Sequence, residues 1–153
     1  MKLAEALNLR ADLQRRIEQL RKRLINNAKV QEGDNPSEKP EELLAELESC
    51  CGQLNDLILR INITNARSEN SDGKTITEII SYKDTLMLKL GVYRDFLDNA
   101  SKKLDRYTQR EIKIVSTVNV REMQKQVDEM AKQLRETDSL LQQMNWNTDL
   151  MEI

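Results

Sequence analysis

The sequence predicts an all-α protein of four long helices, arranged as antiparallel coiled-coil hairpins or as a bundle. Three observations support this prediction. Apolar residues recur at alternating steps of three and four in four stretches of the 153-residue chain. Charged residues make up 33% of the chain and aromatic residues 3%, a composition typical of long amphipathic helices. Turn-forming residues separate the four stretches, which together predict a single helical domain over residues 1–153.

The first predicted helix covers about residues 3–31. Its apolar stripe has the heptad spacing of side chains that face a neighbouring helix. Leu7 and Ile25 lie beside this stripe and widen it beyond what one partner helix needs. Polar residues within the stripe either set the register or lie where it opens to water. The stripe consists of Leu3, Ala6, Arg10, Leu13, Ile17, Leu20, Leu24 and Asn27.

The second predicted helix covers about residues 41–66, with Pro40 in a favourable position for its first turn. The connection before it is short, so we expect an antiparallel hairpin over residues 3–66. Cys50 and Cys51 are expected as free thiols on the packed side, because neighbours in a helix diverge by about 100° and cannot easily form a disulfide. The predicted stripe is Leu44, Leu47, Cys51, Leu54, Ile58, Ile61 and Asn65, with Leu43 and Leu57 beside it.

The third predicted helix covers about residues 76–107. Ser71-Asp72-Gly73 indicates a turn before it, and Thr75 with Glu78 has the spacing of a capping box at its start. The predicted stripe is Ile76, Ile79, Leu86, Leu90, Tyr93, Leu97, Ala100, Leu104 and Tyr107.

A break follows, for which the sequence predicts an extended connection over residues 108–119. Residues 112–118 are rich in β-branched side chains, which favour an extended segment over a helix. Such a segment is either a loop packed under the helices or a segment whose unpaired backbone groups a second copy could satisfy across a two-fold axis. We therefore expect Ile112, Ile114 and Val118 at a contact between subunits of a homo-oligomer.

The fourth predicted helix covers about residues 120–144, with Asn119 and Glu122 placed to cap it. It completes a second hairpin over residues 76–144, and residues 145–153 form a C-terminal tail. The predicted stripe is Val120, Met123, Val127, Met130, Leu134, Thr137, Leu141 and Met144.

Charge is balanced over the whole chain but not along it. The 24 basic and 26 acidic residues nearly cancel, whereas residues 1–31 carry eight basic and three acidic side chains and residues 32–56 carry one and eight. Pairing of the first two helices explains this distribution best. The alternative is a nucleic-acid surface on the basic face of the first helix, formed by Arg15, Arg16, Lys22 and Arg23. No aromatic residue lies among them to stack on a base, so a nucleic-acid partner is not favoured.

The residue types give no support to an enzyme. The chain has no histidine and only two cysteines, so we expect no metal site, no cofactor and no catalytic residues. One polar cluster is a candidate ligand site, because an up-and-down arrangement of the helices would bring its members to one end. It consists of Asn8, Asn62, Asn65 and Trp146. The alternative is a polar helix end whose amides satisfy backbone groups.

Several stretches of the chain resemble a family of small bacterial proteins of unassigned function, often called septicolysin. They are MKLAEALNLRADLQRRIEQLRKRL, NPSEKPEELLAEL, RINITN, YRDFLD, EIKIVSTVNVREMQKQVDEMAKQLRETD and NWNTDL, which together span nearly the whole chain. The resemblance implies a bacterial protein and supplies no catalytic residues. The family label implies a toxin that damages membranes.

The features of the sequence together favour a non-enzymatic interaction or scaffold protein that self-associates. No stretch has the length of a signal-peptide core or of a membrane span, and the cysteines suit a reducing compartment, so we expect a cytoplasmic protein without a membrane partner. A nucleic-acid- or ribosome-associated protein is the alternative, and a membrane-damaging toxin is the third hypothesis.

Overall fold

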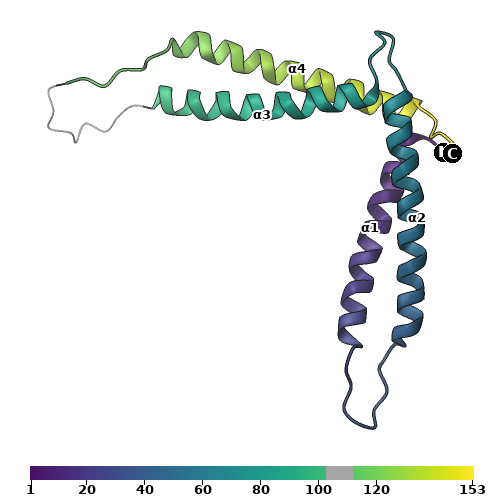
Figure 1. Ribbon diagram of the computed structural model, residues 1–153. Coiled ribbons are helices and arrows are strands. Elements are labelled where there is room, and N and C mark those ends of the chain that lie inside the picture. The colour runs from purple at the N-terminus through teal and green to yellow at the C-terminus, as the bar shows by residue number, and fades with distance from the viewer. Residues whose placement is uncertain (103–111) are drawn as a thin grey trace. The chain divides into compact units, whose positions relative to one another are not determined.

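The computed structural model describes residues 1–102 and 112–153 and confirms the all-α prediction (Figure 1). Its helices are α1 (Leu3–Asn26), α2 (Pro40–Arg67), α3 (Ile76–Ser101) and α4 (Val120–Asn147). The described residues contain two isolated β-bridges and no strand. Residues 112–119 are neither helix nor strand, as expected of a connection. Residues 103–111, which include the predicted end of the third helix and the first part of the predicted connection, lie outside the described residues.

The chain forms two compact units. The first comprises residues Met1–Ile76 together with Gln143–Ile153, and the second comprises Thr77–Gln142. A single domain over residues 1–153 stays a prediction.

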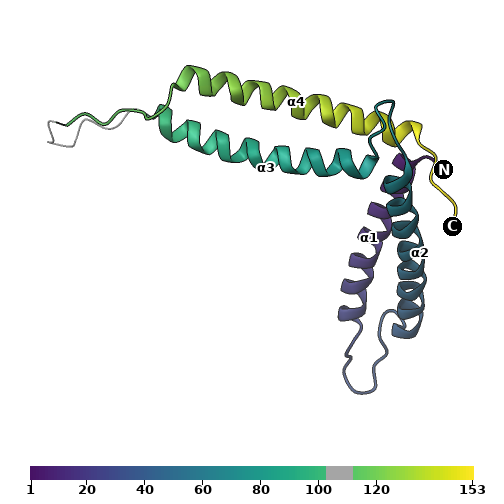
Figure 2. The ribbon, with the colours of Figure 1, turned by 45° about the horizontal axis from the view of Figure 1, so that its top comes forward.

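In the first unit, α1 and α2 lie side by side as an antiparallel hairpin (Figures 1 and 2). The predicted stripe of α1 is confirmed at its centre, where Leu13 and Leu20 are buried. The helix ends at Asn26 rather than near residue 31, because the buried side chain of Asn27 organises the chain that follows. Its amide nitrogen donates to the carbonyl oxygen of Arg23 at 2.8 Å, and its amide oxygen accepts the N–H of Glu38 at 3.0 Å.

The predicted stripe of α2 is confirmed at Ile61 but was wrong at Leu44, Cys51 and Ile58, because the helix is rotated by about one residue. The side chains that face α1 are Leu43, Cys50, Leu57, Ile61 and Thr64, all buried. Each of the first three is followed by an apolar residue, and the sequence spacing alone favoured those followers. In the structure Leu44 is 50% exposed, Ile58 is 36% exposed and Cys51 is exposed. The expectation that both cysteines pack inside therefore holds only for Cys50.

The two ends of the chain are bound together in the first unit. Leu3 N–H donates to the carbonyl oxygen of Thr148 and Leu150 N–H to that of Met1, both at 2.9 Å. The Lys2 ammonium lies 2.8 Å from the carboxylate of Asp149. Leu3 and Leu150 are buried, so this terminal clasp adds apolar packing to the backbone hydrogen bonds.

The tail after α4 is also attached to α2. The buried hydroxyl of Thr64 donates to the carbonyl oxygen of Arg60 at 2.7 Å and accepts the N–H of Met151 at 3.0 Å. Arg60 donates to the carbonyl oxygen of Met151 at 3.1 Å and contacts the carboxylate of Glu152 at 2.7 Å. Residues 148–153 are thus a structural part of the first unit.

In the second unit, α3 packs against α4 through the predicted stripes. The core contains Leu86, Leu90 and Leu97 from α3 with Val127 and Met130 from α4, and Tyr93 packs against it. At its edge the Lys83 ammonium lies 2.5 Å from the carboxylate of Asp138. The predicted cap of α4 is confirmed, because the side-chain oxygen of Asn119 accepts the N–H of Glu122 at 3.1 Å.

The turn between α2 and α3 follows the sequence prediction. Gly73 has a φ of +75°, a conformation that glycine adopts without steric cost. The side-chain oxygen of Asn70 accepts the N–H groups of Asp72 and Lys74, which fixes the turn before α3 begins at Ile76.

Candidate functional site

Two of the basic residues of α1 form ion pairs within the hairpin. Arg16 donates to the carboxylate of Glu46 on α2 at 2.7 Å and 3.0 Å, and Arg23 contacts Glu38 in the connection at 3.1 Å. The hydrogen bond to Glu38 raises the pKa of Arg23, and the same bond lowers the pKa of Glu38. Two of the four residues proposed for the basic face therefore link α1 to acidic partners in the same hairpin, as the charge distribution predicted.

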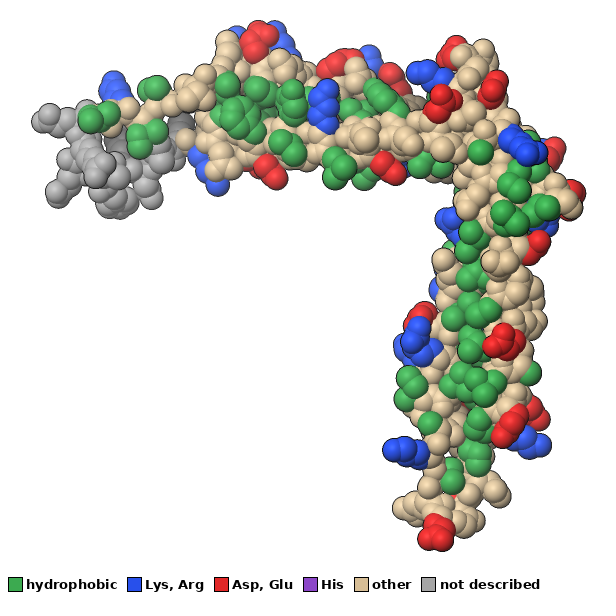
Figure 3. Space-filling view, in the orientation of Figure 1, with side chains coloured by type: hydrophobic (Ala, Val, Ile, Leu, Met, Phe, Trp, Pro, Cys, Tyr) green, Lys and Arg blue, Asp and Glu red, His purple; other side chains and the backbone are tan. Residues whose placement is uncertain are grey.

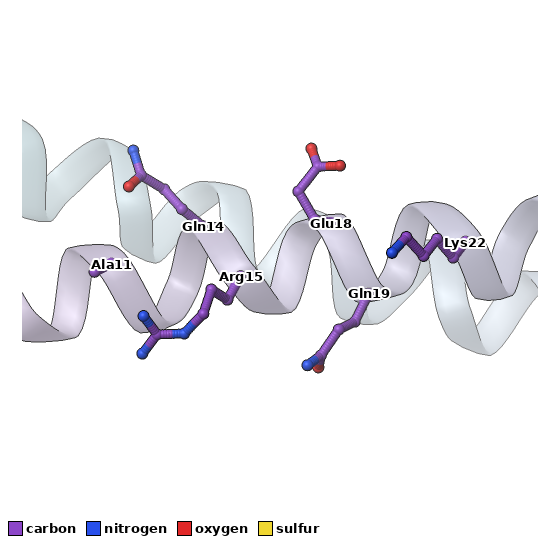
Figure 4. A pocket seen from close by; sticks show the side chains of 6 residues that line it. All are labelled: Ala11, Gln14, Arg15, Glu18, Gln19 and Lys22. Carbon is purple, nitrogen blue, oxygen red and sulfur yellow. The ribbon is translucent and has the colours of Figure 1, made fainter.

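The other two basic residues lie on the outer surface of α1. Arg15 and Lys22 line a shallow hollow to which Gln14, Glu18 and Gln19 also contribute, and all of these side chains come from the one helix (Figure 4). Arg15 pairs with Asp12 one turn away. The hollow offers two cations, Arg15 and Lys22, beside two neutral amides and the carboxylate of Glu18, which makes it a weakly basic surface.

The polar ligand site predicted from the sequence is not formed as a buried cluster. Asn8 and Asn62 are exposed, Asn65 is half-buried, and Trp146 is 56% exposed. The buried polar groups of this unit are instead Asn27, Thr64 and Asn145. Thr64, the residue before Asn65, takes the buried position on α2, and Asn65 is half-buried beside it.

The most distinctive surface of the first unit is an apolar strip along α2, here called the open face. It consists of Leu44, Leu47, Cys51, Leu54 and Ile58, of which Leu47 and Leu54 are half-buried and the others exposed. Leu44, Cys51 and Ile58 are seven residues apart, so they point in nearly the same direction. Figure 3 shows apolar side chains running along the α1–α2 hairpin.

The two edges of the hairpin differ. At one edge, Arg16 and Glu46 close the contact between the helices with an ion pair. On a helical projection, Glu46 lies on the other side of the buried stripe of α2 from the open face. At the open edge, Ile17 and Leu24 of α1 are half-buried beside the open face. One edge is therefore polar and paired, whereas the other is apolar and accessible.

A second apolar surface lies in the second unit. Leu88, Val92 and Phe96 of α3 are exposed and lie one turn apart on the side of the helix away from α4. Phe96 also lines a hollow with Ile114 and Val115 from the connection before α4. Of the residues predicted at a subunit contact, Ile112 and Ile114 are exposed and Val118 is half-buried.

Sequence reasoning missed the terminal clasp and the attachment of the tail to α2. These rely on backbone groups of Met1, Thr148 and Met151, which carry no signal in the sequence. The one available signal was Thr64, a small hydroxyl residue on the packed side of α2.

The fold and these surfaces define a small all-α protein of two helical hairpins with unpaired apolar faces. Among the residues that the structure describes, no helix has the length and apolar character needed to cross a membrane.

The chain belongs to a family of unknown function, DUF6847, whose model matches residues 10–150. Among solved structures it is similar to a functionally unknown conserved protein from Corynebacterium diphtheriae. That match has 44% sequence identity, a TM-score of 0.88 and coverage of 99% of both chains. The comparison with curated proteins gives no match. Neither match carries the septicolysin label that the sequence resemblance implied.

Proposed function

We propose that this protein is a non-enzymatic interaction protein of the cytoplasm that self-associates and serves as a scaffold. The observation that carries the proposal is the open face of α2. Monomeric proteins expose single apolar side chains freely, but a continuous apolar strip along a helix marks an interaction surface. Leu44, Cys51 and Ile58 form such a strip, and the residues between it and α1 are only half-buried.

The second unit supports the same function. The exposed residues Leu88, Val92 and Phe96 make α3 apolar on two sides, and a helix of this kind is usually covered on both. Ile112 and Ile114 extend the apolar surface beyond the end of α3 and remain the proposed contact of the connection, together with Val118. The chain thus carries two separate surfaces, which suits a scaffold that holds more than one neighbour.

Sedimentation velocity across a micromolar concentration series tests self-association. The proposal predicts a mass that rises from one chain, 17.8 kDa, toward a multiple of that value as concentration increases. A mass of one chain throughout the series would contradict it. Unchanged sedimentation after replacement of Arg15 by Glu on the outer side of α1 provides the matched control.

A nucleic-acid-associated function is the second candidate, and its support is the hollow that carries Arg15 and Lys22 (Figure 4). Phosphate binding by such a surface weakens steeply with salt. Fluorescence anisotropy of a labelled single-stranded RNA, measured at low and moderate salt, tests it directly. Salt-sensitive binding that is lost in an Arg15→Glu, Lys22→Glu variant would favour this candidate over the scaffold.

A further inference from the structure

We propose that α2 pairs antiparallel with α2 of a second copy of the chain, about a two-fold axis that passes beside Cys51. This inference rests on the proposed self-association and names the surface and symmetry that produce it. Cys51 lies at the centre of the open face, and its thiol is free and exposed.

The apolar residues of the open face are spaced symmetrically about Cys51. Leu44 precedes it by seven residues and Ile58 follows it by seven. In a two-fold contact between antiparallel helices, a residue before the axis meets a residue on the same flank of the other copy at about the same separation after it, to within one residue. Leu44 of each copy therefore meets Ile58 of the other, and each contact occurs twice. Leu47 and Leu54, four before and three after the axis, meet in the same way on the side nearest α1.

The polar residues beside the open face obey the same symmetry. Glu48 lies three residues before Cys51 and Asn55 four after it, whereas Glu41 lies ten before and Asn62 eleven after. All four are exposed. Antiparallel pairing about Cys51 places each carboxylate opposite an amide that can donate a hydrogen bond, and it separates the like charges of the two copies. This pairing gives the exposed amide of Asn62 a partner in the carboxylate of Glu41 on the other copy.

The hairpin leaves this edge accessible to a second copy. The ion pair between Arg16 and Glu46 lies at the opposite edge, so a copy that docks on the open face leaves it intact. Spacing by seven residues suits any helical partner, but carboxylates on the flank before Cys51 and amides after it suit an antiparallel copy of the same helix. The matching of apolar with apolar and of carboxylate with amide about one residue is the property expected of a surface that binds its own copy.

Oxidative cross-linking of the native protein tests the position of the axis. Diamide takes up two electrons and two protons as two Cys51 thiols join in one S–S bond. The wild type and a Cys50→Ala variant are expected to give a covalent dimer on a non-reducing gel, and a Cys51→Ser variant is expected to give none. The matched control places a thiol elsewhere on the same helix, by Gln53→Cys in the Cys51→Ser background. Gln53 is exposed but points about 160° away from Cys51, so this variant should not cross-link.

Sedimentation equilibrium tests the energetic role of the face. Ile58→Asp is expected to weaken the dimer at least about tenfold, which corresponds to about 1.4 kcal/mol. Gln53→Asp, at an exposed residue on the opposite side of α2 from Cys51, should change the dimer dissociation constant by less than about twofold. Circular dichroism establishes that both variants remain helical, and the cross-linking result does not depend on either.

The outcomes separate this inference from the proposed function. If Ile58→Asp leaves the dimer dissociation constant unchanged, or if the Gln53→Cys variant cross-links as readily as the wild type does through Cys51, the α2 pairing is overturned. Self-association would then use another surface. A wild-type protein that stays monomeric at high micromolar concentration overturns both.

Discussion

Replacing Thr64 by Val tests how firmly the C-terminal tail is attached to α2. The Thr64 side chain is fully buried, and its hydroxyl accepts the N–H of Met151 at 3.0 Å while donating to the carbonyl oxygen of Arg60 at 2.7 Å. Val fills nearly the same volume, so the change removes hydrogen bonds without opening a cavity. The carbonyl of Arg60 keeps its place in the helix, but the N–H of Met151 loses its acceptor.

A buried donor left without a partner costs about 1–3 kcal/mol. We therefore expect Thr64→Val to lower the free energy of unfolding by this amount and the amide of Met151 to exchange with solvent at least about tenfold faster. Urea unfolding followed by circular dichroism measures the first effect, and hydrogen exchange measures the second. Thr64→Ser keeps the hydroxyl and should preserve the slow exchange.

The matched control is Thr137→Val in α4. Its hydroxyl also donates to a carbonyl oxygen one turn earlier, that of Gln133 at 2.7 Å, but within residues 1–102 and 112–153 no distant segment donates to it. The cost there should be within about 0.5 kcal/mol. Equal effects of the two Thr→Val changes, or an unchanged exchange rate at Met151, would refute the reasoning.

Three further predictions follow from the packing and the charges. Cys50→Ala should destabilise the protein by about 1–2 kcal/mol because Cys50 is buried, whereas Cys51→Ser should change the free energy of unfolding by less than about 0.5 kcal/mol; equal costs by urea titration would contradict the observed orientation of α2. Asn119→Ala removes the cap of α4 and should cost about 0.5–2 kcal/mol, detectable as a lower urea midpoint; no shift would argue against the cap. The hydrogen bond from Lys83 lowers the pKa of Asp138 in the folded protein. The ion pair therefore stabilises the fold at pH values above the pKa that Asp138 has in the unfolded chain, and this stabilisation is lost as the pH falls through the lower folded-state pKa. The difference in melting temperature between wild type and Asp138→Asn should thus shrink in acid, and a difference that grows would contradict the pairing.

The sequence was sufficient for the packed sides of α3 and α4. In α3 and α4 the predicted positions Leu86, Leu90, Val127 and Met130 are those that pack together. The starts of α2 and α4 were also predictable, because Pro40 and Asn119 act locally. Where a local cap sets the start of a helix and the spacing of apolar residues sets its packed side, the rest of the fold changes neither.

The register of α2 could not be decided from spacing alone. Leu43-Leu44, Cys50-Cys51 and Leu57-Ile58 place two apolar residues side by side, so two stripes fit the same heptad pattern. Packing against α1 buries the first member of each pair and exposes the second. Adjacent apolar pairs repeated every seven residues therefore indicate a helix with two apolar faces, one of which is left for a second partner.

The candidate sites were predictable only in part. The charge imbalance between residues 1–31 and 32–56 correctly indicated pairing of the first two helices, which Arg16 and Glu46 realise. The four-residue polar cluster placed Asn65 on the stripe of α2, where the structure leaves it half-buried, and a ligand shared by the four residues stays a prediction. The terminal clasp had no sequence signal, because its hydrogen bonds join backbone groups that every residue carries.

A single distance between two spin labels tests the proposed pairing of α2 most directly. A nitroxide is attached to the thiol of Asn62→Cys in a background of Cys50→Ala and Cys51→Ser. An antiparallel pair centred on position 51 separates the two labels by about 33 Å along the helix axis, from 22 residues at about 1.5 Å each. Pulsed dipolar spectroscopy should therefore give a distance of about 35 Å once the spacing between the helices, about 8–10 Å, is included. A distance near that helix spacing would indicate parallel helices, and the absence of any dipolar signal at a dimer-forming concentration would contradict the pairing of α2.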